Sequence, residues 1–173
     1  MIEIRELTKS DSLKAKQFIH FVSELVYEDT YLLIDKLPSL KFEKAWLKDK
    51  LKSIQSSNRV LLCAWHGKNL IGYCDAGREK YKNRNNVGIG LCVSKDFRGK
   101  GLGEKLLRAV IRLAKKKLKP KNIYLSVYSE NKPAIALYKK LGFKEFARFP
   151  NWTLHKGKYH DSIYMILENR LKK

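Results

Sequence analysis

The segment DFRGKGLGEKLL, residues 96–107, places three glycines at alternate positions directly before a run that is typical of a helix. Gly99, Gly101 and Gly103 are each less favourable than alanine inside a helix, so their place at its start needs another reason. Upstream, residues 87–93 (VGIGLCV) form an apolar stretch typical of a buried strand. When a strand passes through a glycine-rich turn into a helix, unpaired backbone N–H groups and the positive helix end point to one place. Such a place is suited to phosphates.

Two well-known phosphate loops do not match this segment. A P-loop requires Lys and then Ser or Thr after its last glycine, whereas Glu104 and Lys105 follow Gly103. The dinucleotide fingerprint G-x-G-x-x-G has a wider final gap than GKGLG. We therefore expect a phosphate-binding turn of another kind, to which Arg98 and Lys100 add positive charge.

The elements around the turn alternate between strands and helices. Residues 2–7 alternate as a strand does, and Ser10 and Asp11 are candidate N-caps of the helix that follows. A second helix is expected over residues 40–54. The further strands are expected at residues 59–65, 70–76, 87–93, 122–128, 143–154 and 159–167. One further helix is expected from residue 102 to an end within residues 115–120 (KKKLKP), and another at residues 131–141. The order β-α-α-β-β-β-α-β-α-β-β predicts an α/β fold with a mixed sheet.

Composition indicates one soluble domain over residues 1–173, because 44% hydrophobic content allows a substantial core. No apolar run reaches the roughly 20 residues that cross a bilayer, and the N-terminus lacks the apolar core of a signal peptide. We therefore expect a cytoplasmic protein with no membrane partner. Cys63, Cys74 and Cys92 are widely spaced in apolar surroundings, which favours reduced, buried thiols and no metal.

The net charge of +20 is unevenly distributed along the chain. Residues 1–79 hold 13 basic and 11 acidic residues, whereas residues 80–173 hold 24 and 6. One interpretation is a lysine-rich, solvated surface. The other is a field that attracts a polyanion, either a phosphorylated cofactor or a nucleic acid. Both interpretations remain open at this point.

Two motifs together resemble the GNAT superfamily of N-acetyltransferases. Residues 98–103 (RGKGLG) match [QR]-x-x-G-x-[GA], the acetyl-CoA diphosphate signature of that family, and residues 131–143 (NKPAIALYKKLGF) resemble its second signature, N-x-x-A-x-x-L-Y-x-K-x-G-F. The start of the chain also resembles the family's first strand and helix, so the resemblance covers nearly the whole chain. It implies the GNAT fold, a single mixed sheet of about seven strands flanked by about four helices, with a splayed central strand pair.

The resemblance implies acetyl-CoA as cosubstrate and assigns residues to it. The backbone N–H groups of the glycine turn would hold the diphosphate, the end of the preceding strand would pair with the pantetheine amides, and Asn131 and Ala134 would contact the same arm. Tyr138 would protonate the leaving thiolate, unless it is an ordinary helix position, and Asn131 is also a candidate N-cap. The implied cofactor-binding residues are Leu91, Val93, Arg98, Gly99, Lys100, Gly101, Leu102, Gly103, Asn131 and Ala134.

The implied reaction is direct transfer of the acetyl group to a primary amine, on a small molecule or on a protein N-terminus or lysine. A base must free the lone pair of the amine. Many family members place a Glu on the strand before the glycine turn, but residues 87–93 contain no carboxylate. Asp75 and Glu79 are candidates that would act through water, although a solvated or structural charge is the more usual role of such residues.

The acceptor is expected between residues 27–38 and residues 151–167, the latter resembling the G-x-Y-x-D-x-x-x-M ending of small-amine and protein N-acetyltransferases. Aromatic residues in these segments would line the acceptor site or belong to the core: Tyr31, Trp152 and Tyr159. Asp161 would anchor an ammonium group or pair with a neighbouring lysine.

Two other classes of protein remain open. The missing strand carboxylate is compatible with a catalytically silent acetyl-CoA-binding module. The basic C-terminal half is compatible with a ribosome- or nucleic-acid-associated protein, and an acetyltransferase acting on a ribosomal protein would combine both roles. Both a monomer and a homodimer are compatible with the sequence.

Overall fold

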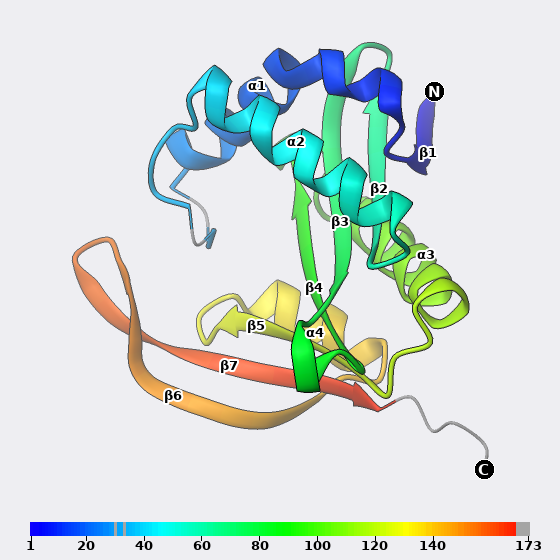
Figure 1. The fold of residues 1–173 in the computed structure, drawn as a ribbon. Helices are drawn as coiled ribbons and strands as arrows, with labels where there is room; N and C mark the ends of the chain where they lie inside the picture. The colour runs from blue at the N-terminus through cyan, green and yellow to red at the C-terminus, as the bar shows by residue number, and fades with distance from the viewer. Residues whose placement is uncertain (30, 33, 169–173) are drawn as a thin grey trace. The chain divides into compact units, whose positions relative to one another are not determined.

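The computed structural model describes residues 1–29, 31–32 and 34–168 as a mixed seven-stranded sheet with helices (Figure 1). The sheet order is β1-β2-β3-β4-β5-β7-β6. The strands are β1 (Ile2–Glu6), β2 (Arg59–His66), β3 (Asn69–Arg78), β4 (Asn86–Val93), β5 (Asn122–Tyr128), β6 (Lys144–His155) and β7 (Lys158–Glu168), and the α-helices are α1 (Ala15–Tyr27), α2 (Leu40–Gln55), α3 (Leu102–Lys117) and α4 (Lys132–Lys140). The predicted order of elements and the mixed sheet are confirmed.

The chain groups into two compact units, which are described separately. The first unit contains residues 1–77 and 90–118, and the second contains residues 78–89 and 119–173. The expectation of a single domain over residues 1–173 stays a prediction. Within the described residues, none of the helices combines the length and apolarity needed to cross a bilayer.

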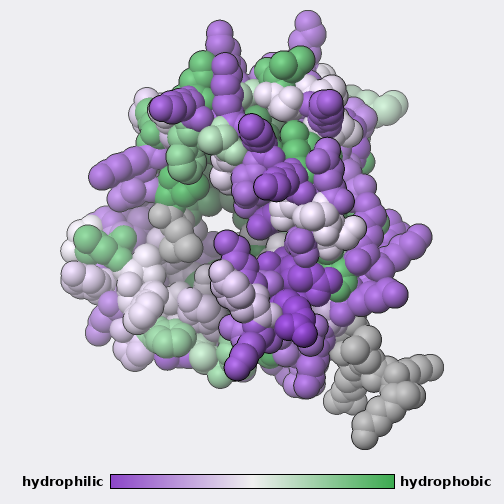
Figure 2. Space-filling view, viewed as in Figure 1, coloured by the Kyte–Doolittle hydropathy of each residue, from purple (hydrophilic) through white to green (hydrophobic). Residues whose placement is uncertain are grey.

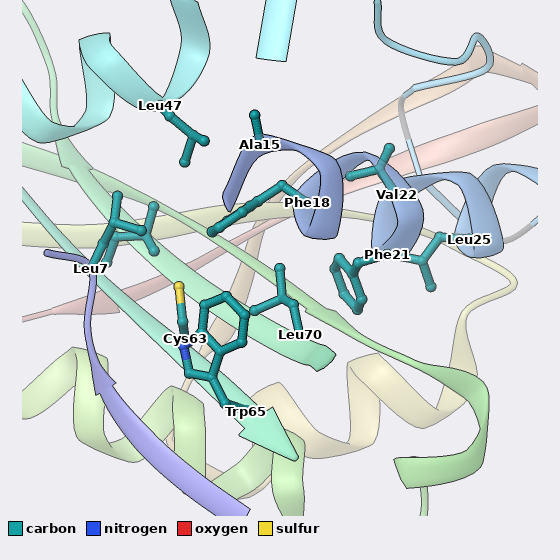
Figure 3. Packing of buried hydrophobic residues seen from close by; sticks show 11 residues of the cluster. Leu7, Ala15, Phe18, Phe21, Val22, Leu25, Leu47, Cys63, Trp65 and Leu70 are labelled. Atoms are coloured by element: carbon teal, nitrogen blue, oxygen red, sulfur yellow. The ribbon is translucent and has the colours of Figure 1, made fainter. Parts of the chain in front are cut away.

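The first unit packs α1 and α2 on one face of β2 and β3, and α3 on the other (Figure 1). β1 and β2 are antiparallel, as are β2 and β3. The core between the helices and the strands contains Phe18, Phe21 and Leu47, all fully buried (Figure 3). The Phe18 ring meets the edge of the Trp65 ring with 6.0 Å between centroids. Burial of such a side chain contributes about 1.5–3 kcal/mol, so this cluster fixes α1 and α2 on the sheet.

The three cysteines are free thiols, as expected. Cys63 and Cys74 are buried in the first unit, as expected, whereas Cys92 is partly exposed, so the expectation of full burial is wrong for this residue. Burial raises the pKa of the Cys92 thiol to about 11. A thiol with a raised pKa is mostly protonated at neutral pH and therefore a weak nucleophile.

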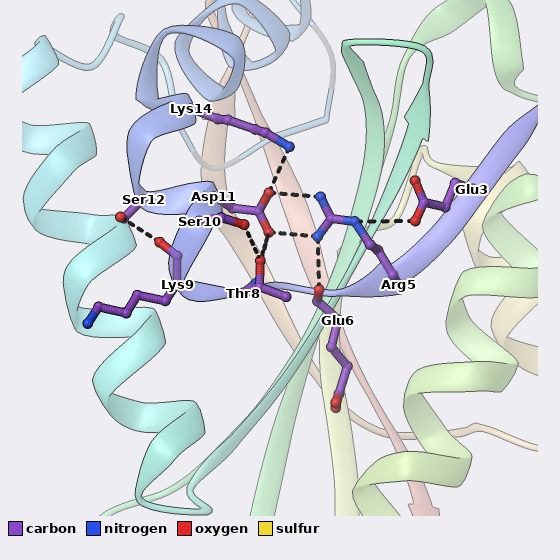
Figure 4. Close-up of polar contacts among 9 residues, drawn as sticks. All are labelled: Glu3, Arg5, Glu6, Thr8, Lys9, Ser10, Asp11, Ser12 and Lys14. Carbon is purple, nitrogen blue, oxygen red and sulfur yellow. Dashed lines mark hydrogen bonds and ion pairs between the residues drawn. The ribbon is translucent and has the colours of Figure 1, made fainter.

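The start of the first helical segment differs from the prediction. Thr8, and not Ser10 or Asp11, is the N-cap residue, and it precedes a short 3₁₀ turn, Lys9–Lys14, before α1 begins. The Asp11 carboxylate folds back to accept a hydrogen bond from the Thr8 backbone N–H at 2.8 Å (Figure 4). Because a 3₁₀ turn has three residues per turn, Leu13 leaves the apolar stripe of the helix and is 88% exposed.

Asp11 is fully buried in the first unit, and its carboxylate accepts hydrogen bonds from several neighbouring donors. Its two oxygens accept hydrogen bonds from the Arg5 guanidinium at 2.7 and 2.8 Å, and Lys14 Nζ lies 3.0 Å from Oδ1 (Figure 4). Burial alone would raise the pKa of Asp11, but the hydrogen bonds from Arg5, Thr8 and Lys14 outweigh burial and hold it well below its ordinary value. The ionised carboxylate therefore stabilises the folded state.

We expect Asp11→Asn to lower the free energy of unfolding at pH 7 by about 2–3 kcal/mol. Removing one partner of a buried charge network costs about 3–5 kcal/mol, and the partial exposure of Arg5 and Lys14 reduces that figure. Because the folded pKa is lowered, the stabilisation is complete above the unfolded pKa of about 4 and declines progressively as pH falls from there towards the lowered pKa of the folded state, so that part of it is lost at pH 3. Urea unfolding at pH 7 and at pH 3 measures both effects.

The matched control is Glu3→Gln, which removes an exposed carboxylate 3.5 Å from the same arginine. An exposed pair contributes about 0–1 kcal/mol, so this variant should unfold almost as the wild type does. Equal effects of the two substitutions at pH 7 would show that burial of Asp11 contributes nothing.

The second unit consists of β5, β6, β7, the start of β4 and α4. β5 and β7 are antiparallel, as are β6 and β7. β4 runs parallel to β5, in a register of three pairs from Asn86–Asn122 to Gly88–Tyr124. Gly142 follows α4 with a φ of +90° and donates its N–H to the Lys139 carbonyl at 3.0 Å. This left-handed glycine ends the helix, close to the expected end at residue 141.

Candidate active site

The glycine turn adopts the backbone conformation that its sequence requires. Gly99 has a φ of +69° and Gly101 a φ of +81°, and Gly101 is the N-cap of α3. Both values lie in the left-handed region, which glycine enters without steric cost. A Cβ atom added to either residue would have no atom within 4 Å among its described neighbours. The conformation, and not lack of space, is the reason for glycine here.

A row of backbone donors lies at the start of α3. Within the described part of the chain, the N–H groups of Gly99, Lys100, Gly101, Leu102 and Gly103 form no backbone hydrogen bond, and the Lys105 N–H closes the first turn on the Gly101 carbonyl at 3.0 Å. Helix N-termini attract anions because such donors add to the positive end of the helix dipole. This row fits the diphosphate of a cofactor.

Arg98 differs from the expectation at both its backbone and its side chain. Its backbone N–H already donates to the Lys95 carbonyl at 3.1 Å. The backbone N–H groups of the turn that can bind a diphosphate are therefore those of residues 99–103. Its guanidinium donates to Glu28 Oε1 and Oε2 at 2.6 and 2.9 Å and to the Val93 carbonyl at 2.9 Å. Arg98 therefore holds the turn in place against α1 and β4, whereas Lys100 is exposed and carries the charge.

The residues that precede the turn belong to the end of β4 in the first unit. Leu91 and Val93 are both partly exposed. The Ser94 N–H donates to the Ile71 carbonyl at 2.9 Å, which fixes the end of β4 to β3. The register of β4 with β5 ends at Gly88. Pairing of Leu91 and Val93 with a bound cofactor stays a prediction.

The remaining predicted cofactor residues lie on α4 in the second unit. The Asn131 side chain accepts a hydrogen bond from the Ala134 N–H at 3.3 Å, so Asn131 is the N-cap of α4. Tyr138 is 8% exposed, and its ring lies 6.0 Å from that of Phe143. The structural role of Asn131 is thereby established, while the contact of these residues with acetyl-CoA stays a prediction.

The two candidate bases have different surroundings. Asp75 is ion-paired with Arg59 and lies 3.4 Å from Lys50 Nζ, so its charge is structural. Glu79, in the second unit, accepts a hydrogen bond from the Tyr124 hydroxyl at 2.5 Å. Burial, with this hydrogen bond, raises the pKa of Tyr124 to about 12. Glu79 also lines a cavity of about 490 Å³ in that unit.

The C-terminal segment places its predicted acceptor residues at the surface of the second unit. Trp152 and Tyr159 are 63% and 66% exposed, so a core position is wrong for both. Asp161 pairs with an arginine and not with a lysine: Arg148 lies 3.3 Å away, and the Asn151 N–H donates to it at 3.1 Å. In the first unit, Tyr31 is 40% exposed.

Sequence reasoning missed Glu43, a buried carboxylate on α2. Glu43 is 4% exposed, and burial raises the pKa of its carboxyl group to about 7. It lines a cavity of about 460 Å³ in the first unit, together with residues 36–39 of the segment expected at the acceptor. A signal was present in the sequence, because Glu43 lies three and four positions before Trp46 and Leu47, on the apolar stripe of α2.

Much of the visible surface is hydrophilic, with smaller hydrophobic areas between (Figure 2). Some of the basic residues have acidic partners. In the first unit, Lys117 in the last turn of α3 bonds Glu6 at 2.6 Å, and Arg108 bonds Glu104 at 2.9 Å. Such surface pairs contribute little stability each.

Comparison with known proteins gives a consistent result. A family model described as "Acetyltransferase (GNAT) family" matches residues 23–143. The L-amino acid N-acetyltransferase AaaT of Escherichia coli (strain K12) is 30% identical over 97 residues, which are 56% of this chain and 60% of that protein. The chain therefore matches less than two thirds of the length of this curated relative.

Solved structures show the same fold. An acetyltransferase of the GNAT family from Streptococcus pneumoniae has a TM-score of 0.86 at 22% identity, covering 98% of this chain and 100% of that one. The structure of yncA from Salmonella typhimurium, described with its cofactor acetyl-CoA, has a TM-score of 0.82 at 24% identity, covering 97% and 94%. The predicted fold class is confirmed by these likenesses.

Proposed function

The chain belongs to the acetyltransferase (GNAT) family, and on this premise we propose that it is an enzyme that transfers the acetyl group of acetyl-CoA directly to an amine. The observation that carries the proposal is the row of N–H groups from Gly99 to Gly103, which have no backbone partner among the described residues. These donors fit a diphosphate, a negatively charged group that this cofactor contains. Bound acetyl-CoA would supply the acetyl group as a thioester.

The residues of this chain have distinct parts in the proposed reaction. The five donors of the glycine turn bind and orient the cofactor, and Arg98, through Glu28 and the Val93 carbonyl, keeps the turn in place. In the first unit, Leu91 and Val93 would supply peptide groups to the pantetheine arm. In the second unit, Asn131 and Ala134 keep the cofactor-binding roles that the family resemblance implies. Tyr138 would hold the proton that the departing thiolate takes up, because a phenol is protonated at neutral pH.

The acceptor class is proposed to be a primary amine, in line with the name of the curated relative, an L-amino acid N-acetyltransferase. The test measures release of free thiol from acetyl-CoA with amino acids, polyamines and N-terminal peptides, including peptides from ribosomal proteins. We expect thiol release that depends on both acetyl-CoA and one class of amine. Tight binding of acetyl-CoA without release for any amine would instead support the silent binding module.

A further inference from the structure

The cavity that contains Glu43 has an aromatic wall. It lies wholly in the first unit, between α1, the segment before α2, α2 itself and β3. The Trp46 ring lies 6.0 Å from both the Phe18 ring and the Tyr73 ring, so the three rings support one another. Phe42 adds a fourth ring, 58% exposed, on the same cavity. Rings packed in this way form a preformed wall for an apolar ligand.

Glu43 is the buried acidic group of this cavity. Its carboxylate forms no hydrogen bond or ion pair with any described residue, and Glu43 as a whole is only 4% exposed. The other polar side chains are differently placed. Ser39 Oγ accepts from the Phe42 N–H at 3.2 Å, Tyr73 is hydrogen-bonded to Cys92, and Lys36 is exposed. A buried carboxylate without a partner is costly, so a cation that enters the cavity gains a ready partner.

The aromatic wall is suited to the same kind of ligand. An ammonium group is attracted to the face of a tryptophan ring. Lys50 Nζ already lies 5.1 Å from the centroid of Trp46, so this ring accepts a cation within the protein itself. The cavity of about 460 Å³ is of the size of small-molecule sites. The charge of Glu43, the aromatic wall and the volume of the cavity therefore all favour a compact organic cation as the ligand.

We propose that this cavity binds the amine acceptor as a primary ammonium on an apolar or aromatic framework, with Glu43 as its ion-pair partner. The proposal rests on the proposed acetyltransferase function, because it names the class of acceptor for that reaction. Glu43 would bind and orient the amine, and its neighbours Phe18, Trp46 and Tyr73 would exclude water from the apolar part.

The experiment compares two probes of equal size on the full chain by titration calorimetry. 2-Phenylethylamine carries the ammonium group, and 2-phenylethanol carries a neutral hydroxyl in its place. In the wild type we expect the amine to bind roughly ten- to a hundredfold more tightly, as hydrogen bonds to charged groups allow. Quenching of tryptophan fluorescence that is lost in Trp46→Phe would locate the probe in this cavity.

Two variants separate the role of Glu43 from a general effect of charge. Glu43→Gln should abolish the preference for the amine, whereas Asp49→Asn, the same change on the exposed side of α2, should keep it. Equal binding of both probes by the wild type, no binding of either, or a preserved preference in Glu43→Gln would each overturn the proposal.

Acetyl-CoA affinity, measured on the same samples, separates this proposal from the proposed function. If acetyl-CoA binds and the amine preference is absent, the acceptor site is wrong while the acetyltransferase function stands. If the amine preference is present and acetyl-CoA does not bind, the proposed function fails while the cation site stands. Retained acetyl-CoA binding in Glu43→Gln also shows that this variant is folded.

Discussion

Tyr138→Phe is expected to lower kcat by roughly 10²- to 10⁴-fold, with little change in the affinity for acetyl-CoA. This range is the usual contribution of a positioned proton donor. The substitution keeps the ring, which is 8% exposed and packs 6.0 Å from Phe143, and removes only the hydroxyl. Steady-state kinetics with saturating acetyl-CoA, together with calorimetry of acetyl-CoA binding, measures the two quantities separately.

The control is Tyr128→Phe, because Tyr128 is another buried tyrosine of the second unit, 6% exposed and outside the proposed machinery. It should turn over as the wild type does. If Tyr138→Phe instead keeps a normal kcat and only melts at a lower temperature, Tyr138 is a packing residue. The thiolate would then leave unaided or take its proton from water.

Gly101→Asp should weaken acetyl-CoA binding by about a hundredfold or more. Two unit charges 4 Å apart repel by about 4 kcal/mol at an effective dielectric constant of 20, and each 1.4 kcal/mol is tenfold in affinity. The added carboxylate would lie next to the donor row that we assign to the diphosphate. Open space around Gly101 admits the side chain, and Asp tolerates the left-handed φ of +81° better than most residues.

Gly67→Asp is the matched control for strain and charge. Gly67 also has a left-handed φ, +61°, and open space where a Cβ atom would lie, but it belongs to the hairpin turn between β2 and β3. Both variants should lose similar stability in a thermal melt, while only Gly101→Asp loses acetyl-CoA affinity in calorimetry. Undiminished affinity in a folded Gly101→Asp variant would remove the turn from the cofactor site.

The elements of the fold were predictable where the pattern is local. The apolar stripe of α3 predicted a helix from Leu102, and Leu106, Leu107 and Val110 are fully buried in the first unit. The start of the first helical segment was not predictable in the same way. Its cap depends on the Thr8 backbone and on a carboxylate that Arg5 holds from the neighbouring strand. Contacts between elements leave no periodic trace in the sequence.

The same distinction between local patterns and contacts between elements applies to the candidate site. The glycine turn could be predicted because a left-handed φ leaves a direct signature, glycine, at the residue concerned. The partner of Arg98 could not, since Glu28 lies 70 positions earlier in the chain. Glu43 was also missed. Its position on the apolar stripe of α2 was a signal, but a lone acidic residue on a helix usually faces water, and α1 and β3 pack around this one.

The ion pair between Glu28 and Arg98 determines where a grafted segment between α1 and α2 should begin. Glu28 is the C-cap residue of α1, and its two oxygens bind the guanidinium that holds the glycine turn. A designer who exchanges the segment between α1 and α2 to alter ligand preference therefore has a defined junction. Grafts that begin after Glu28 retain the anchor of the turn, whereas grafts that replace Glu28 release it.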